Sequence, residues 1–158
     1  FQAFFEIVRA ASPDLAKKEA LDRSRELLKK GKHEAAERVL RLLQRDDLST
    51  PEGDLALGMA QLLQQGLEPA NAGRDQGNAI QLFLKVSRKD GFPFLKQLEK
   101  ESALLGAEGL LYLGFALAER QGAERELGGE ILKIVAKKFA AKPEGKVAKA
   151  KLKTQGIG

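Results

Sequence analysis

The residue types that carry out most enzyme chemistry are scarce in this chain. Its 158 residues contain no cysteine and one histidine, His33, which lies in the stretch KKGKHEAAERVL. Thiol nucleophiles, disulfides and thiolate metal sites are therefore excluded, and a zinc site would need carboxylates for the rest of its shell. A histidine that acts as a general base needs a positioned partner and a pocket that excludes water. Lys30, Lys32 and Glu34 instead favour solvent around His33, which we expect to follow a turn at Gly31.

The other groupings that could carry chemistry lack the spacing or the surroundings that it requires. The carboxylate pairs Asp46-Asp47 and Glu99-Glu101 lie in polar stretches, whereas a catalytic carboxylate needs a pocket that shifts its pKa. Gly128-Gly129 lacks the G-x-G-x-x-G spacing of a dinucleotide site and follows no expected strand. We therefore expect no catalytic residue, no cofactor and no metal, and we interpret the chain as a non-enzyme.

Hydrophobic residues recur with a period near 3.6, which predicts a single all-α domain over residues 1–158. Ser12-Pro13-Asp14 and Thr50-Pro51-Glu52 each combine a helix cap with a proline at the first helical position. The expected segments are an apolar N-terminal helix at 1–11, a repeat core at 13–141 and a Lys-rich end at 142–158. Within the core we expect helices at 13–30, 33–45, 51–65, 78–89, 93–105, 107–120 and 123–141, with a loop at 66–76.

Three expected second helices share one spacing: a small residue, a large residue four positions later, and an aliphatic residue three further on. The sets are Ala36/Leu40/Leu43, Ala79/Phe83/Val86 and Gly128/Leu132/Val135. Two of the helices that precede them contain Leu57-Gly58 and Leu113-Gly114, and Ser24 takes the small position in the remaining one. Small residues allow close helix approach while the large residue fills the groove, so the pattern predicts packed helix hairpins.

These units resemble the tetratricopeptide and Sel1-like class of helical repeats. KKGKHEAAERVLRLL is similar to the turn and second helix of a tetratricopeptide unit, and LALGMAQLLQQG with DQGNAIQLFLKVSRKDG is similar to a Sel1-like unit. The signature positions are 43 and 49 residues apart instead of about 34. The resemblance implies antiparallel helix hairpins stacked as a short right-handed α-superhelix of about eight helices, a TPR-like scaffold that binds proteins.

In such superhelices the first helix of each hairpin lines a concave groove. The resemblance therefore implies a partner-binding groove formed by Leu55, Met59, Leu62, Leu111, Phe115 and Ala118, with Lys18 and Arg25 at a basic end. An apolar groove of this kind suits an amphipathic helix or a short apolar peptide. In the alternative, Met59 and Phe115 pack against residues 1–11 or 93–105, or are ordinary core residues.

The net charge of +5 comes from the C-terminal end. Eight of the 27 basic residues and one of the 22 acidic ones lie between Lys133 and Lys153, which leaves −2 on the rest of the chain. Lys142, Lys146, Lys149 and Lys153 follow a 4-3-4 spacing and would share one stripe of a helix. The stripe could contact nucleic-acid phosphates or an anionic membrane surface, or it could simply solubilise a terminal helix.

The chain offers no expected membrane span, because its longest stretch without charged or strongly polar residues, 109–118, is shorter than about 20 residues. It begins at Phe1 and not at methionine, so we expect a piece of a larger, bacterial-looking protein, with the cytoplasm as the default location and a processed or periplasmic form left open. The predicted partner is another protein or a domain of the same parent protein. Nucleic acid or an anionic membrane is the alternative.

Overall fold

The computed structural model describes residues 1–67, 72 and 77–156, and these contain helices and no strands. The nine helices in this part of the chain are α1 (Gln2–Ala11), α2 (Pro13–Lys29), α3 (His33–Arg45), α4 (Pro51–Gln64), α5 (Asn78–Ser87), α6 (Phe94–Lys100), α7 (Ser102–Ala118), α8 (Gly122–Lys138) and α9 (Pro143–Thr154). The all-α prediction is confirmed.

The predicted helix starts are present with their caps. The Ser12 hydroxyl accepts a hydrogen bond from the Leu15 amide at 3.3 Å, and the Thr50 hydroxyl accepts one from the Gly53 amide at 3.0 Å. Prolines occupy the first position of α2, α4 and α9, where the missing amide proton costs no helical hydrogen bond. Side-chain capping of this kind stabilises a helix by about 1 kcal/mol.

Gly31 forms the predicted corner between α2 and α3. Its φ of +75° lies in the left-handed region that favours glycine. The amide of Lys32 donates to the carbonyl of Leu27, and the amide of Gly31 donates to that of Leu28. This is the hydrogen-bond pattern of a Schellman motif, which satisfies the last carbonyls of α2 and reverses the chain.

The helix boundaries differ from the predicted ones around residue 105. The predicted helix at 93–105 ends at Lys100, and α7 begins at Ser102. Gly106 then breaks the helical backbone inside α7, with φ 80° and ψ 167°. The predicted boundary between 105 and 107 is therefore present as the kink at Gly106, and the unexpected feature is a second break, between Lys100 and Ser102. Most of the predicted loop at 66–76, namely 68–71 and 73–76, lies outside the described residues.

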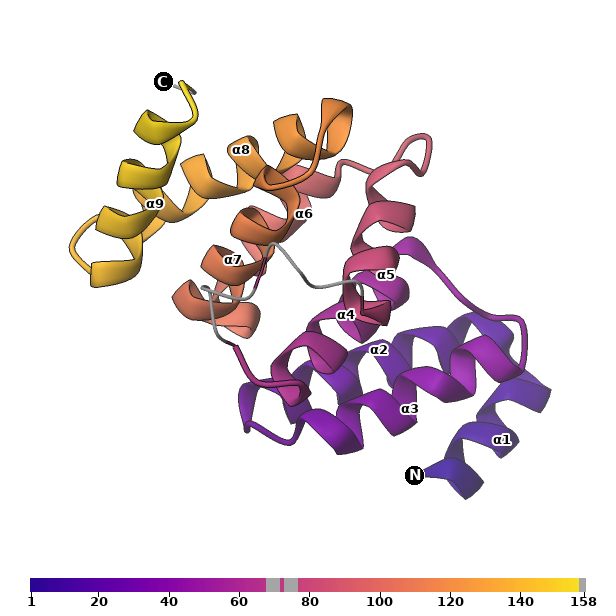
Figure 1. Cartoon of the computed structure of the whole chain (residues 1–158). Coiled ribbons are helices and arrows are strands. Elements are labelled where there is room, and N and C mark those ends of the chain that lie inside the picture. The colour runs from indigo at the N-terminus through magenta and orange to yellow at the C-terminus, as the bar shows by residue number, and fades with distance from the viewer. Residues whose placement is uncertain (68–71, 73–76, 157–158) are drawn as a thin grey trace.

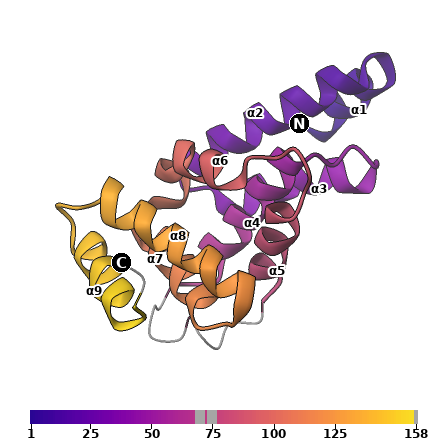
Figure 2. The same cartoon turned by 90° about the horizontal axis from the view of Figure 1, so that it is seen from above.

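Helices that follow one another in the chain pack side by side. The main contacts join α2 with α3, α3 with α4, α4 with α5, α7 with α8 and α8 with α9. Figures 1 and 2 show α1, α2 and α3 at one end of the molecule, α7, α8 and α9 at the other, and α4 and α5 between them. The two terminal helices α1 and α9 are therefore far apart.

The repeated small and large residues pack between helices, as the sequence predicts. All nine residues of the three sets are buried. A Cβ added at Gly58 would lie 3.3 Å from the ring of Phe83, and one added at Gly114 would lie 2.7 Å from the side chain of Leu132. In these two hairpins the glycine of the first helix thus faces the large residue of the following helix.

No single helix in the described part of the chain is long and apolar enough to cross a membrane. Only α6 and α7 together reach that length and composition, and they are bent by 112° at the break between them.

Candidate interaction surfaces

The residues that could carry chemistry are held in structural contacts. His33 is half-buried at the start of α3. Asp46 pairs with Arg9 at 3.4 Å, Glu99 pairs with Lys137 at 3.6 Å, and each pair joins two helices. Over the described residues, no group of three or more histidines, aspartates or glutamates is placed to hold a metal ion.

Five of the residues predicted to line an apolar groove are core residues. Leu55, Met59, Leu62, Leu111 and Ala118 are buried, with at most 4% of their surface exposed. The reason is that neighbouring helices cover both elements on several sides: α4 contacts α2, α3, α5 and α7, and α7 contacts α2, α4, α6, α8 and α9. The structure therefore corrects the groove prediction for these five side chains, which present no open surface to a partner.

The remaining predicted groove residues are separated from one another. Phe115 is half-buried in α7, where the ammonium group of Lys151 lies 5.0 Å from its ring centroid. Lys18 is exposed on α2 and donates to Asp22 at 3.0 Å, and this hydrogen bond together with the charge of Asp22 raises the pKa of Lys18. Arg25 pairs with Glu101 at the end of α6. The two basic residues therefore bind their own neighbours and form no basic end of a groove.

The apolar surface that the sequence reasoning missed lies on α1. Phe5 is fully buried and anchors α1 to the rest of the protein, while Phe4 is 51% exposed and Ile7 is 72% exposed. The exposed residues that share the outward stripe of this helix are all apolar, and we call them the α1 outer face: Ala3, Phe4, Ile7, Ala10 and Ala11. The signal was present, because three of the first five residues are phenylalanine and only Gln2, Glu6 and Arg9 are polar.

A pocket of about 280 Å³ lies beside this helix, between α1, α2 and α3. Its floor and walls are apolar and come from Phe1, Leu27, Ala35, Val39 and Leu42, and Gln2, Arg23 and Arg38 complete the lining. The rings of Phe1 and Phe4 are 5.9 Å apart, so the pocket is continuous with exposed aromatic surface. The volume falls below the usual range for small-molecule sites, about 300–1,000 Å³, and suits one or two inserted side chains.

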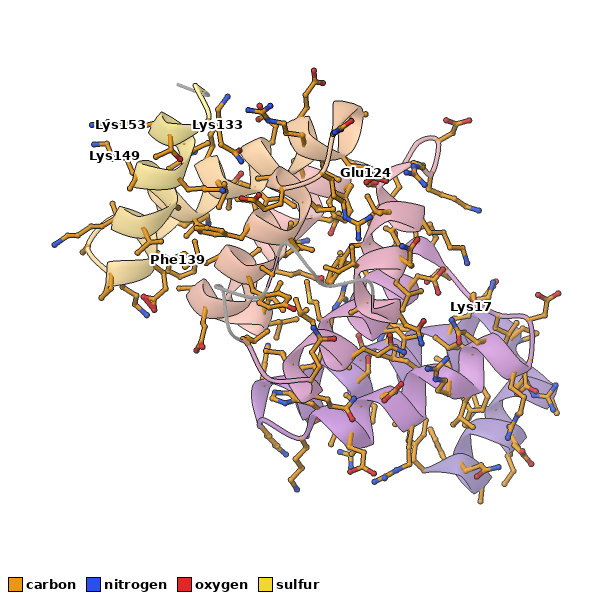
Figure 3. All side chains as sticks on the ribbon, in the orientation of Figure 1. Lys17, Glu124, Lys133, Phe139, Lys149 and Lys153 are labelled. Atoms are coloured by element: carbon orange, nitrogen blue, oxygen red, sulfur yellow. The ribbon has the colours of Figure 1, made fainter. Side chains whose placement is uncertain are left out.

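The four predicted polyanion-binding lysines lie on α9 and at its N-terminal cap. We call Lys142, Lys146, Lys149 and Lys153 the lysine stripe; all four are exposed. Figure 3 shows Lys149 and Lys153 projecting from α9 away from the body of the molecule. An adjacent side of α9 packs against the protein, mainly against α8, and carries the buried residues Gly145, Ala148 and Leu152.

The other lysines of this region differ in their surroundings. Lys133 pairs with Glu130 at 3.2 Å, Lys137 pairs with Glu99, and Lys151 pairs with Glu119. In the part of the chain that the structure describes, no carboxylate lies within ion-pairing distance of the lysine stripe. The tertiary structure thus separates lysines that are paired with carboxylates, two of them between helices, from the unpaired lysines of the stripe.

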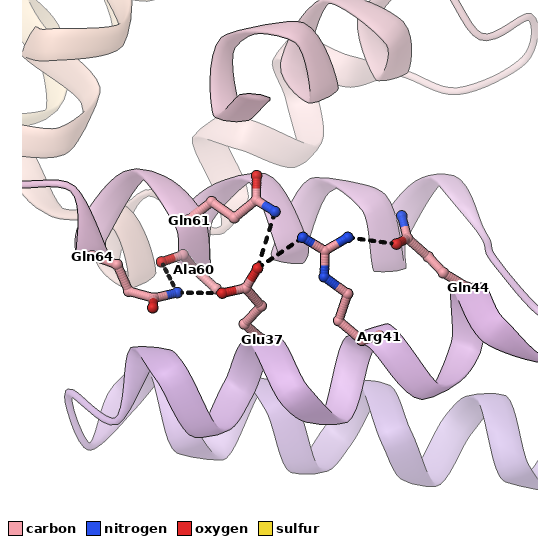
Figure 4. A network of polar contacts seen from close by, with 6 residues as sticks. All are labelled: Glu37, Arg41, Gln44, Ala60, Gln61 and Gln64. Carbon is pink, nitrogen blue, oxygen red and sulfur yellow. Dashed lines mark hydrogen bonds and ion pairs between the residues drawn. The ribbon is translucent and has the colours of Figure 1, made fainter. Parts of the chain in front are cut away.

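A polar network joins α3 to α4 on a third surface (Figure 4). The Glu37 carboxylate accepts hydrogen bonds from Gln64 at 2.8 Å, Gln61 at 3.1 Å and Arg41 at 2.9 Å. Partial burial by itself would raise the pKa of Glu37, but these three donors outweigh it and lower that pKa. The network stabilises the contact between two helices and leaves Glu37 ionised, so it does not resemble a proton-transfer site.

The comparisons with known proteins supply no family for this chain. No family model matches it, and neither a curated protein nor a solved structure matches it. The tetratricopeptide-like resemblance therefore stays a prediction.

Proposed function

We propose that this domain is a TPR-like α-superhelix that acts as a protein-interaction scaffold, and that it binds an apolar helical segment through the α1 outer face and the adjoining pocket. The segment belongs to another protein or to another domain of the same parent protein. The observation that carries the proposal is the exposure of Ile7 and Phe4 on a helix whose opposite side is already buried through Phe5.

Helix α1 has an apolar surface on both sides. Exposed apolar patches on soluble domains mark sites of interaction. In this structure α1 packs mainly on α2, and its two charged residues pair with α3 and the turn after it: Glu6 with Arg45 at 3.3 Å, and Arg9 with Asp46. Both charges are therefore paired within the protein, and neither belongs to the five residues of the α1 outer face.

The shape of the surface favours a helix as the bound segment. Phe4 and Ile7 are three residues apart and form a ridge along α1, and a second helix can pack against such a ridge with side chains spaced three and four apart. The pocket beside the ridge can take one large apolar side chain from that helix. Hairpins of helices packed in chain order, as α2 to α5 and α7 to α9 are, support the scaffold part of the proposal.

The test combines capture with mapping of the contact. The photo-crosslinking amino acid p-benzoylphenylalanine replaces Ile7, lysate treated with nuclease is applied at about 0.5 M salt, where exposed charges are strongly screened, and crosslinked peptides are identified by mass spectrometry. We expect crosslinks to the apolar side of a helical segment in another protein, and at least a tenfold loss of capture in a Phe4→Glu/Ile7→Glu double variant.

The matched control is the double variant Leu15→Glu/Val147→Glu, which adds the same two charges to exposed apolar residues of α2 and α9. It should capture the partner as well as the unmodified protein does. Equal capture by the Phe4→Glu/Ile7→Glu variant, crosslinks confined to other copies of this chain, or crosslinks scattered over unrelated segments would overturn the proposal.

A further inference from the structure

We infer that the lysine stripe is a second binding surface, independent of α1, that docks on the phosphate backbone of double-stranded nucleic acid without reading its sequence. The stripe comprises Lys142, Lys146, Lys149 and Lys153. What carries this inference is the arrangement that the fold produces: four exposed ammonium groups lie in one row, and within the described residues none of them has an ion-pairing carboxylate, whereas Lys133, Lys137 and Lys151 are each paired with one.

The row has the dimensions of a backbone contact. From Lys142 to Lys153 it extends roughly 16 Å at a rise of about 1.5 Å per residue. Duplex DNA carries about one negative charge per 1.7 Å of its axis, so each of the four lysines can reach a separate phosphate. Because the row lies on a helix held against α8 by buried Gly145, Ala148 and Leu152, the spacing is fixed before binding.

The absence of an apolar face favours nucleic acid over a membrane. Helices that lie on a membrane bury an apolar face in the headgroup region, but the apolar side of α9 is packed against protein. Val147, 43% exposed, is the one large exposed hydrophobic residue on α9. A surface with exposed lysines and no exposed apolar face therefore suits the phosphate backbone of nucleic acid better than a lipid bilayer.

The side chains of the stripe also restrict what it can recognise. The row contains lysine alone, and arginine, asparagine and glutamine, which read base edges in the grooves, are missing from it. The nearby aromatic ring of Phe139 is half-buried, with the Lys142 ammonium 5.6 Å from its centroid, so it offers no open platform for an unpaired base. Backbone contact to a duplex, independent of sequence, remains.

The experiment is a salt titration of binding. Fluorescence anisotropy of a labelled duplex of about 20 base pairs is measured with the full chain between about 50 and 200 mM KCl. Four phosphate contacts predict a slope of log Kobs against log salt near −3.6, which is about a 150-fold loss of affinity across this range. Two duplexes of unrelated sequence should bind within about twofold of each other, as backbone contacts carry no sequence information.

Two variants with the same net charge distinguish the effect of the stripe lysines from the effect of net charge. Replacing all four stripe lysines by glutamine should reduce affinity at the lower salt concentration at least tenfold and bring the slope close to zero. The control replaces Lys29, Lys32, Lys89 and Lys96, which are exposed elsewhere on the surface, by glutamine. It should keep both the affinity and the slope, and circular dichroism should show equal helicity in both variants.

Three results would overturn the inference. An equal loss in the two variants would mean that net charge alone attracts the duplex. A slope that does not depend on the stripe would place the contact elsewhere. Binding to vesicles that contain about 30% phosphatidylserine, with no binding to the duplex, would assign the stripe to a membrane surface instead.

Discussion

The two terminal helices attach to the same stack of helices in opposite ways. Helix α1 is held by one large side chain, the fully buried ring of Phe5, and its outer face is apolar. Helix α9 is held by Leu152 together with two small residues, Gly145 and Ala148, of which Gly145 lies against the backbone of Phe139, and its exposed face carries the lysine stripe. The comparison teaches that anchoring and outer surface are separate properties: both helices have a buried face, but α1 exposes Phe4 and Ile7 side by side, whereas α9 exposes one large apolar residue, Val147.

The largest expected effect comes from removing the anchor of α1. Phe5→Ala should lower the free energy of unfolding by about 3 kcal/mol, because truncating a buried phenylalanine loses its burial and leaves a cavity. Phe4→Ala, one residue away on the exposed side, should change it by less than about 0.5 kcal/mol. Urea denaturation followed by circular dichroism measures both. Equal losses in the two variants would contradict the division of α1 into an inner and an outer face.

The corresponding substitution in α9, Gly145→Ala, adds a methyl group, whereas Phe5→Ala removes a ring. A Cβ at Gly145 would lie 2.1 Å from the carbonyl oxygen of Phe139, a backbone atom that cannot turn aside. Gly145→Ala should therefore destabilise the protein by about 2 kcal/mol, even though alanine favours helices by about 1 kcal/mol over glycine. The control Lys149→Ala should be nearly neutral in the same thermal or urea unfolding. A stabilised Gly145→Ala variant would show that α9 is held less closely than the structure indicates.

A smaller effect should distinguish two lysines on the same helix. Lys151 pairs with Glu119 and lies over the ring of Phe115, so Lys151→Met should cost about 1 kcal/mol of stability. Lys149→Met should leave stability unchanged and should instead weaken duplex binding. Thermal unfolding and the anisotropy titration together give both readings. A larger loss of duplex affinity in Lys151→Met than in Lys149→Met would contradict this distinction between the two lysines.

The smallest expected effect on stability is at Glu37, in the contact between α3 and α4. This contact involves neither terminal helix. The pKa of Glu37 is lower in the folded protein than in the unfolded chain, so its ionised form stabilises the fold. This contribution is fully present above the unfolded value of about 4.3 and is lost as the pH falls through the lower folded value. Glu37→Gln should therefore destabilise the protein by about 1 kcal/mol at pH 7 and by less at pH 3, as measured by urea unfolding. A loss of the same size at both pH values would mean that the charge of Glu37 plays no part.

Much of the fold could be predicted because its signals are local. Serine or threonine followed by proline marks the starts of α2 and α4, and glycine at a left-handed φ ends α2 at the predicted corner. The periodic apolar residues then identify the buried side of each helix. The break between residues 105 and 107 was predicted and is present at Gly106, whereas the further break between Lys100 and Ser102 was not predicted.

The interaction surfaces were predicted less evenly. The lysine stripe follows from spacing alone, since residues four and three apart share a side of any helix. Most residues of the predicted apolar groove are instead buried in the core. Periodicity shows that Met59 lies on an apolar side of its helix, but it does not show how many other helices cover that side. The same ambiguity hid the α1 outer face, where Phe4 and Phe5 look equivalent in the sequence and have opposite surroundings in the structure.

The sequence by itself determined the class of this protein: an all-α domain without cysteine, with one histidine, with glycine opposite large residues between helices, and with its excess positive charge in the last quarter of the chain. Only the tertiary structure decided which apolar residues reach solvent and which lysines are neutralised. The physical reason is that caps, turns and helical period act over a few residues, whereas burial and ion pairing depend on contacts such as Lys137 with Glu99 or Lys151 with Glu119, which join residues far apart in the chain.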